Sequence, residues 1–302
     1  MEQQAGIDSW ISSGGLRCAE SQARVGAQTL GFVRAWVFGI WLCKVATAPF
    51  FLLAELPVSI FEPPVFMRMA PIEVWAWLLR PDVLTGFQIL LCTCVTLTAL
   101  GLRPYRPIAA TTSILLTFHQ GLIRSFGHIN HPEIPLLLAT YVLAMFPAAD
   151  GFTWRTRRQA LQPSSLYVAP ILLIAALLLL TYTAAAAYRI AHHGLATLAG
   201  EPLMWTIAQH SLADEHSLIV IFIHHHSTVA QLLRCSVPTV TVFEWTAPLA
   251  LVSRRFRWLW LGFVFMFHIV TWLVIDVFFW ESLLLAIAIL PALDRVTAIL
   301  PP

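Results

Sequence analysis

The sequence predicts an all-α protein, a polytopic bundle of transmembrane helices. Of its 302 residues, 58% are hydrophobic and only 11% are charged, and the mean hydropathy is +0.75. Soluble domains carry about 25% charged residues, so this chain has too few charges to cover a surface that faces water. The composition therefore excludes an ordinary soluble enzyme and a disordered chain. The net charge of +2 provides no basic field for phosphates, so we expect membrane lipids and no nucleic acid as partners.

Eight apolar runs supply the expected helices. A helix needs about 20 apolar residues to cross the hydrocarbon layer, and each run is long enough, or nearly so, for a tilted span. The runs cover residues 30–54, 84–102, 107–123, 133–147, 167–188, 237–252, 257–275 and 281–298. The first 28 residues are polar and predict a loose tail, 1–28, ahead of a membrane domain, 29–302.

Arginine clusters predict the orientation, because short loops rich in basic residues stay in the cytoplasm. The clusters are Arg103 with Arg106, Arg155 with Arg157 and Arg158, and Arg254 with Arg255 and Arg257. All three lie inside if residues 189–236 stay outside, so the apolar segment near 202–234 is expected to lie at the interface without crossing. We therefore expect about eight spans in a cell membrane, with both termini in the cytoplasm.

This topology gathers polar groups at the outer face. Ten of the eleven histidines lie at or near that face, whereas the inner face carries little besides arginine. Polar groups are kept in a bilayer only where they are solvated, paired or used. Any chemistry is therefore expected on the outer side.

Four polar fragments lie in or beside the apolar runs. They are Asn130-His131 in a loop, Tyr188-Arg189 with His192 and His193 at the end of an Ala-rich run, Glu244 inside a run, and His268 in mid-run. Histidine can transfer protons or ligate a metal, and a carboxylate in the membrane has a partner or a task. Each fragment also has a structural interpretation, such as a solvated loop histidine or an arginine that reaches the headgroups. Lys44 is the chain's only lysine, and so its only amine base besides the N-terminus.

In this order and spacing, the fragments resemble the horizontally transferred transmembrane (HTTM) domain family, which includes the vitamin K-dependent gamma-glutamyl carboxylase. The resemblance runs from about residue 28 to residue 298. Its features are the Arg34-containing first span, Asn130-His131 opening a span that ends Phe146-Pro147, Tyr188-Arg189-Ile190, Glu244 with Pro248 before the basic turn 254–257, and Phe267-His268.

The resemblance implies a chemistry for some of these residues. In the carboxylase, a lysine deprotonates the reduced vitamin K, oxygen adds, and the resulting base removes a proton from a glutamate. Carbon dioxide then captures the carbanion, helped by a histidine that follows an asparagine. The histidine corresponds to His131, its neighbour to Asn130, and the lysine to Arg189. Arginine stays protonated in proteins, so Arg189 cannot be the base, which would come from His131, His192 or His193, and glutamate carboxylation itself is not expected.

The first functional hypothesis is an enzyme-like membrane protein with an outward-facing polar pocket for a vitamin K-like quinone or another lipophilic molecule. The pocket would combine apolar walls with a few convergent polar groups. Its catalytic candidates are His131, Arg189 and Asn130, and its binding candidates are Glu244, His268, Tyr188, His192 and His193.

Two other hypotheses remain open. The protein could instead be a non-enzymatic helper that binds an exported peptide or partner protein, because some bacterial members of the family look like maturation factors for secreted peptide toxins. Metal or haem binding is the third hypothesis. His224 with His226, or His128 with His131, have the close spacing that imidazole ligands use, and His119 and His268 could serve as axial haem ligands. No Cys/His spacing matches a closed zinc site, and no metal ligand is predicted.

Overall fold

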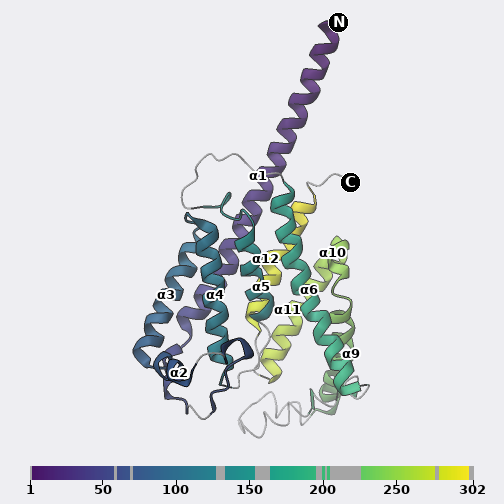
Figure 1. Cartoon of the computed structure of the whole chain (residues 1–302). Coiled ribbons are helices and arrows are strands. Elements are labelled where there is room, and N and C mark those ends of the chain that lie inside the picture. The colour runs from purple at the N-terminus through teal and green to yellow at the C-terminus, as the bar shows by residue number, and fades with distance from the viewer. Residues whose placement is uncertain are drawn as a thin grey trace. The chain divides into compact units, whose positions relative to one another are not determined.

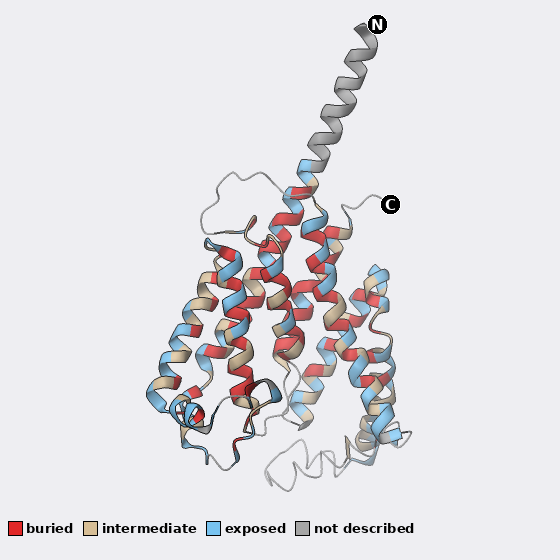
Figure 2. Cartoon of the chain, in the orientation of Figure 1, coloured by how far each residue is buried: buried red, intermediate tan, exposed pale blue. Residues whose placement is uncertain are grey.

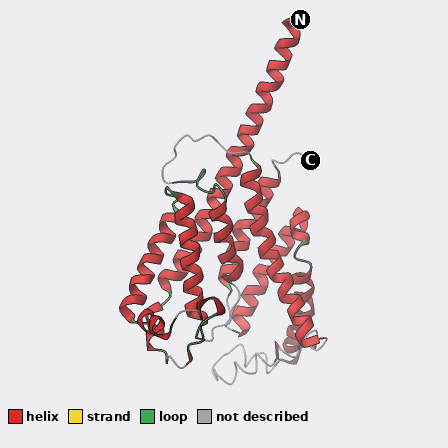
Figure 3. Ribbon diagram, viewed as in Figure 1, coloured by secondary structure: helices red, strands yellow, loops and turns green. Residues whose placement is uncertain are grey.

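The structure is a computed structural model of the whole chain (Figure 1). It describes residues 2–57, 60–68, 71–126, 133–153, 164–194, 199–200, 203–204, 226–275 and 279–298, and the side chains from residue 20 onward apart from Phe66, Ile72, His193 and Ile275. Within these ranges the secondary structure is helical and contains no strand (Figure 3). The predicted all-α class is therefore confirmed.

The chain divides into two compact units. Unit 1 consists of Met1–Ile174 and Pro291–Pro302, and unit 2 of Ala175–Leu290. The boundaries fall within two helices, α6 (Ser165–His193) and α12 (Trp280–Thr297), so each of these helices contributes residues to both units.

Among the described residues, unit 1 has five helices and two short 3-10 helices besides its parts of α6 and α12. They are α1 (Glu2–Thr47), η1 (Phe50–Glu55), η3 (Val65–Met67), α2 (Ile72–Leu78), α3 (Pro81–Ala99), α4 (Tyr105–Arg124) and α5 (Glu133–Met145). Helix α3 starts with a proline at its first position and an acidic residue, Asp82, in its first turn, both of which favour a helix start. Helix α1 packs against α3 and α5, and α4 packs against the same two helices.

The buried face of α1 explains why it packs so closely. Leu30, Val33, Val37 and Trp41 are fully buried, and they recur every three or four residues, as one side of a helix does. Buried and exposed residues alternate along this helix in Figure 2. The apolar stripe of α1 is therefore part of the core of unit 1.

A buried arginine ties α1 to the chain that follows α5. Arg34 is fully buried, and its guanidinium donates hydrogen bonds to the carbonyl oxygens of Ala148 (2.7 Å) and Phe152. Gly101, whose φ is +67°, lies against this guanidinium, and a Cβ atom at position 101 would collide with it. A glycine is required there because only glycine adopts a positive φ freely and leaves room for the arginine.

In the described part of unit 2, three further helices occur besides its parts of α6 and α12. They are α9 (Ser227–Trp245), α10 (Leu249–Val252) and α11 (Arg254–Ile275). The break between α9 and α10 occurs just before Pro248, which cannot continue a helical hydrogen-bond ladder. Helix α11 packs against both α9 and α10.

Four helical segments among the described residues are long and apolar enough to cross a membrane. They are Glu20–Thr47, Pro81–Ala99, Ser165–His192 and Arg254–Val274. The other four predicted spans are also helical over most of their length. However, α5 is only 13 residues long, and the run 237–252 is divided between α9 and α10. Helix α12 contains three charged residues, and α4 carries several polar side chains. The membrane character of the chain is thus supported, and the number of eight spans stays a prediction.

One prediction, at the start of α1, differs from the structure, and another, near 202–234, stays a prediction. The polar tail 1–28 is not loose, because α1 begins at Glu2, and Ala23 and Ala27 are already buried. This segment contains glutamine, alanine and arginine, which are good helix formers. The predicted interfacial segment 202–234 lies mostly outside the described residues, but its last part belongs to α9.

Candidate functional site

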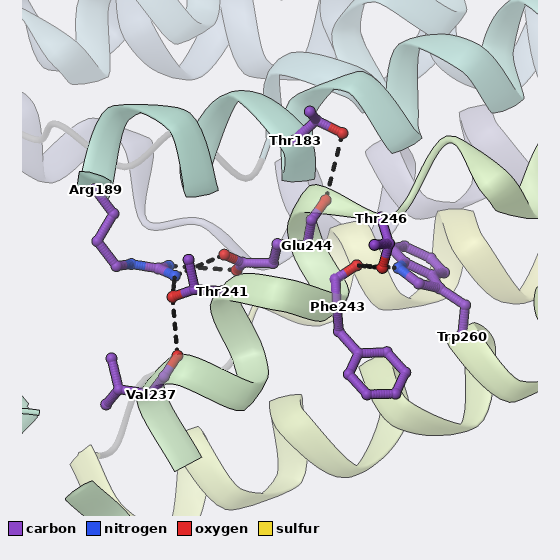
Figure 4. A network of polar contacts seen from close by, with 8 residues as sticks. All are labelled: Thr183, Arg189, Val237, Thr241, Phe243, Glu244, Thr246 and Trp260. Atoms are coloured by element: carbon purple, nitrogen blue, oxygen red, sulfur yellow. Dashed lines mark hydrogen bonds and ion pairs between the residues drawn. The ribbon is translucent and has the colours of Figure 1, made fainter. Parts of the chain in front are cut away.

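The candidate site in unit 2 is an ion pair inside the apolar helices (Figure 4). Arg189, near the end of α6, donates from Nη1 to Glu244 Oε2 at 2.7 Å and from Nη2 to Glu244 Oε1 at 3.3 Å. The side chain of Glu244 is 7% exposed and that of Arg189 is 27% exposed. This two-pronged geometry is the strongest form of an arginine–carboxylate contact. Sequence analysis singled out both residues, and the structure brings them together.

Two threonines fix the geometry of this pair. Thr241 lies three residues before Glu244 on the same side of α9, and its hydroxyl accepts a hydrogen bond from Arg189 Nη1 at 3.1 Å while donating to the carbonyl of Val237. Thr183 of α6 donates to the backbone carbonyl of Glu244 at 3.3 Å. Both carboxylate oxygens and one arginine nitrogen are thus held in place by α6 and α9 together.

A second polar contact joins α6 to α11. The hydroxyl of Tyr182 is hydrogen-bonded to Nε2 of His268 at 2.9 Å, and both side chains are buried. Trp260 packs edge-on against the Tyr182 ring, with ring centroids 5.0 Å apart. Its indole N–H donates a hydrogen bond to the carbonyl of Phe243. Nδ1 of His268 is buried and has no hydrogen-bond partner among the described residues.

Tyr182 was missed in the sequence although a signal for it exists. It lies seven residues before Arg189, which is two helical turns, so both side chains lie on the same side of α6. Thr241 likewise lies three residues before Glu244, so these two side chains share one side of α9. Because neither tyrosine nor threonine is unusual in a membrane helix, only the spacing relative to a charged residue would have identified them.

The other predicted site residues are not part of this arrangement. Tyr188 is 60% exposed and stacks on the exposed His192 with ring centroids 3.8 Å apart, so these two form a surface pair at the end of α6. The side chain of His193 and the whole of Asn130 and His131 lie outside the described residues.

A second charged cluster occurs in unit 1, where the sequence had identified only its lysine as unusual. Glu133, at the start of α5, is 5% exposed and contacts two cations: Lys44 Nζ at 2.9 Å and Arg124 Nη2 at 3.5 Å. His119 lies five residues before Arg124 on α4 and is fully buried. Its ring stacks on that of Phe50 with centroids 4.6 Å apart. One carboxylate thus balances two cations drawn from α1 and α4.

The described residues contain no candidate metal site. Among them, histidine, cysteine and acidic side chains form no group of three or more that could hold an ion. The histidines at 128, 131, 224 and 226, on which this hypothesis also rested, lie outside the described residues.

No family model matches this chain, and neither a curated protein nor a solved structure is detectably similar to it. The resemblance to the HTTM family therefore stays a prediction.

Proposed function

We propose that this chain is an integral membrane protein of the HTTM type, and that the polar site of α6, α9 and α11 binds a lipophilic, quinone-like molecule. The observation that carries the proposal is the Arg189–Glu244 pair, which is held within 2.7 Å inside otherwise apolar helices. A buried ion pair is seldom worth its desolvation cost as a stabilising contact. Charged groups at membrane depth are instead typical of binding and transport sites.

The residues around the pair suit a ligand with an oxygen at one end and an apolar body. A quinone, when bound, supplies redox chemistry that the side chains lack. The Arg189 side chain is partly exposed and carries only donors, so it would orient a ligand oxygen. The Tyr182 hydroxyl and the buried His268, whose Nδ1 has no partner among the described residues, would hold or exchange a proton. Glu244 keeps the guanidinium in place.

Arg189 would not act as a base in this site. Its guanidinium is protonated and already bonded to Glu244 and Thr241, so its task would be to position and to stabilise negative charge. This argues for a modification or a binding function other than glutamate carboxylation. The predicted eight spans, with the histidine-rich loops outside, are part of the same proposal.

Mass spectrometry of lipid extracts from the purified full chain tests the binding. A quinone or similar lipid should co-purify with the protein, and Arg189→Gln should reduce its amount at least several-fold. Arg80→Gln is the matched control, because Arg80 forms an exposed ion pair with Asp82 far from this site in sequence. If extracts of the native protein hold no such molecule, or if both variants lose it equally, the proposal is wrong.

A non-enzymatic helper for an exported peptide or partner protein is the second candidate. It is favoured by one observation, that Arg189 is bonded on two sides by protein groups, as a purely structural residue would be. In that case the double variant Arg189→Met with Glu244→Leu removes both charges at once and should leave partner maturation nearly intact. A strong loss in the double variant would favour the ligand-binding site instead.

A further inference from the structure

A pocket of about 500 Å³ lies in unit 1, where α3 ends and α4 begins. The charged residues that line it are Arg103, Arg106 and Asp150. It contains none of the residues discussed for the site in unit 2, so it requires an explanation of its own.

The charge of this pocket is positive. Arg103 and Arg106 are both exposed, and neither forms a hydrogen bond or ion pair with any residue in the described ranges. The single carboxylate, Asp150, accepts a hydrogen bond from the Tyr167 hydroxyl at 2.8 Å. Two guanidinium groups, which together can donate several hydrogen bonds to an oxyanion, are therefore balanced by only one acid.

The start of α4 adds to this positive character. The helix begins at Tyr105 without a side-chain cap and without an acidic residue in its first turn. The first N–H groups of a helix lack partners within it, and the helix dipole favours an anion there. The buried Arg34 lies behind, with its guanidinium carbon 5.9 Å from the centre of the Tyr105 ring. A cavity, two exposed arginines and an uncapped helix start thus coincide.

The position of the pocket along the helices indicates the kind of anion. Helix α3 is one of the segments long and apolar enough to cross a membrane, and it ends at Ala99. If it spans, Arg103 and Arg106 lie at the boundary between lipid and water. The pocket walls include apolar Pro147 and Leu166, which can contact acyl chains, and basic pockets between membrane helices at this level hold phosphate headgroups.

We propose that this pocket binds the phosphate of an anionic membrane phospholipid. Arg103 and Arg106 donate to the phosphate oxygens, the start of α4 faces the same charge, and the apolar wall contacts the lipid tails. The proposal concerns unit 1 alone and stands whether or not the site in unit 2 binds a quinone.

Native mass spectrometry of the full chain in detergent, with added dioleoylphosphatidylglycerol or dioleoylphosphatidylcholine, measures this binding. The first lipid has an anionic headgroup and the second a zwitterionic one. We expect the native protein to prefer phosphatidylglycerol, and the double variant Arg103→Gln with Arg106→Gln to bind it roughly tenfold more weakly. Asp150→Asn removes the only acid among the described residues that line the pocket, so it should strengthen binding, an outcome that misfolding cannot produce.

Arg255→Gln is the matched control. Arg106 and Arg255 are each the second residue of their helix, and both are exposed, so the comparison of Arg106→Gln with Arg255→Gln separates the pocket from general attraction to basic residues. Equal losses in these two single variants, or equal affinity for the two lipids, would overturn the proposal. An excess of inorganic phosphate should not displace the lipid; complete displacement would mean that the pocket serves a free phosphate, and the assignment to a lipid would be wrong.

Discussion

Lys44, the only lysine of the chain, forms an ion pair with Glu133 across 2.9 Å in unit 1. The carboxylate of Glu133 also contacts Arg124 at 3.5 Å, so a single buried acid serves two cations from two different helices. The three charges are of unequal importance, and this gives the first prediction.

Replacing the shared acid should cost more than replacing either cation. Glu133→Gln removes the buried carboxylate that both poorly exposed cations contact, and it is expected to destabilise the fold by about 3–5 kcal/mol. Lys44→Met should cost less, because Glu133 keeps Arg124 as a partner. Unfolding in mixed micelles, followed by circular dichroism, measures both, and a larger cost for Lys44→Met would contradict the shared-acid interpretation.

The Arg189–Glu244 pair predicts a strongly non-additive pair of substitutions. Arg189→Met alone leaves Glu244 buried without its counter-charge and should cost about 3 kcal/mol. Adding Glu244→Leu removes the unpaired charge, so the double variant should be more stable than the single one. The same unfolding measurement tests this, and simple addition of the two single costs would show that the pair does not act as a unit.

The Tyr182–His268 hydrogen bond predicts the effect of removing one oxygen atom. Tyr182→Phe preserves the ring that packs on Trp260 but leaves Nε2 of His268 buried without its partner. A loss of about 1–3 kcal/mol is expected. Phe243→Leu, on the neighbouring α9, serves as a control for general loosening, and infrared or NMR detection of the histidine ring would report whether its hydrogen bond has changed.

The glycines of unit 1 provide a matched pair of backbone tests. Gly101→Ala places a Cβ atom against the Arg34 guanidinium at a positive φ, so it should destabilise by more than about 1 kcal/mol. Gly86→Ala lies in the exposed interior of α3 with nothing within 4 Å of the new atom. It should stabilise by about 0.5–1 kcal/mol. Similar thermal shifts for both would contradict the close approach at Gly101.

The predicted topology can be tested with the cysteines that the chain already has. If residues 189–236 are outside, the exposed Cys235 should react with a membrane-impermeant maleimide added to intact cells, once the other cysteines are replaced by serine. Arg255→Cys in a chain without other cysteines should react only after the membrane is opened. Labelling of position 255 from outside would invert or break the proposed topology.

Much of the helical architecture was predictable because it depends on local sequence. Every apolar run became a helix over most of its length, and the low charge content by itself predicted a membrane protein. The exceptions have local causes that hydropathy does not report. Pro248 lies where α9 gives way to α10, and the polar N-terminal residues have enough helix propensity to extend α1 back to Glu2.

The candidate site was only half predictable. Arg189, Glu244 and His268 were identifiable because each is a polar residue within an apolar run, and such residues need a partner or a task. Residue type did not identify their partners, because Tyr182 and Thr241 are ordinary residues in a membrane helix and only their spacing from a charged residue sets them apart. In unit 1, the pairing of Lys44 with Glu133 was not identifiable either, because the two residues lie far apart in the sequence. The exposed pair of Tyr188 with His192 shows the converse, since proximity in sequence to Arg189 did not place them in the site.

The sequence by itself thus determined that the chain forms apolar helices and which of their residues are too polar to lie there alone, because hydropathy and helix propensity act over a few consecutive turns. Only the tertiary structure decided that Arg189 is neutralised by Glu244, that Glu133 serves two cations, and that Arg103 and Arg106 border a cavity. These pairings depend on which faces of packed helices meet, and side-chain complementarity over the whole core sets that choice.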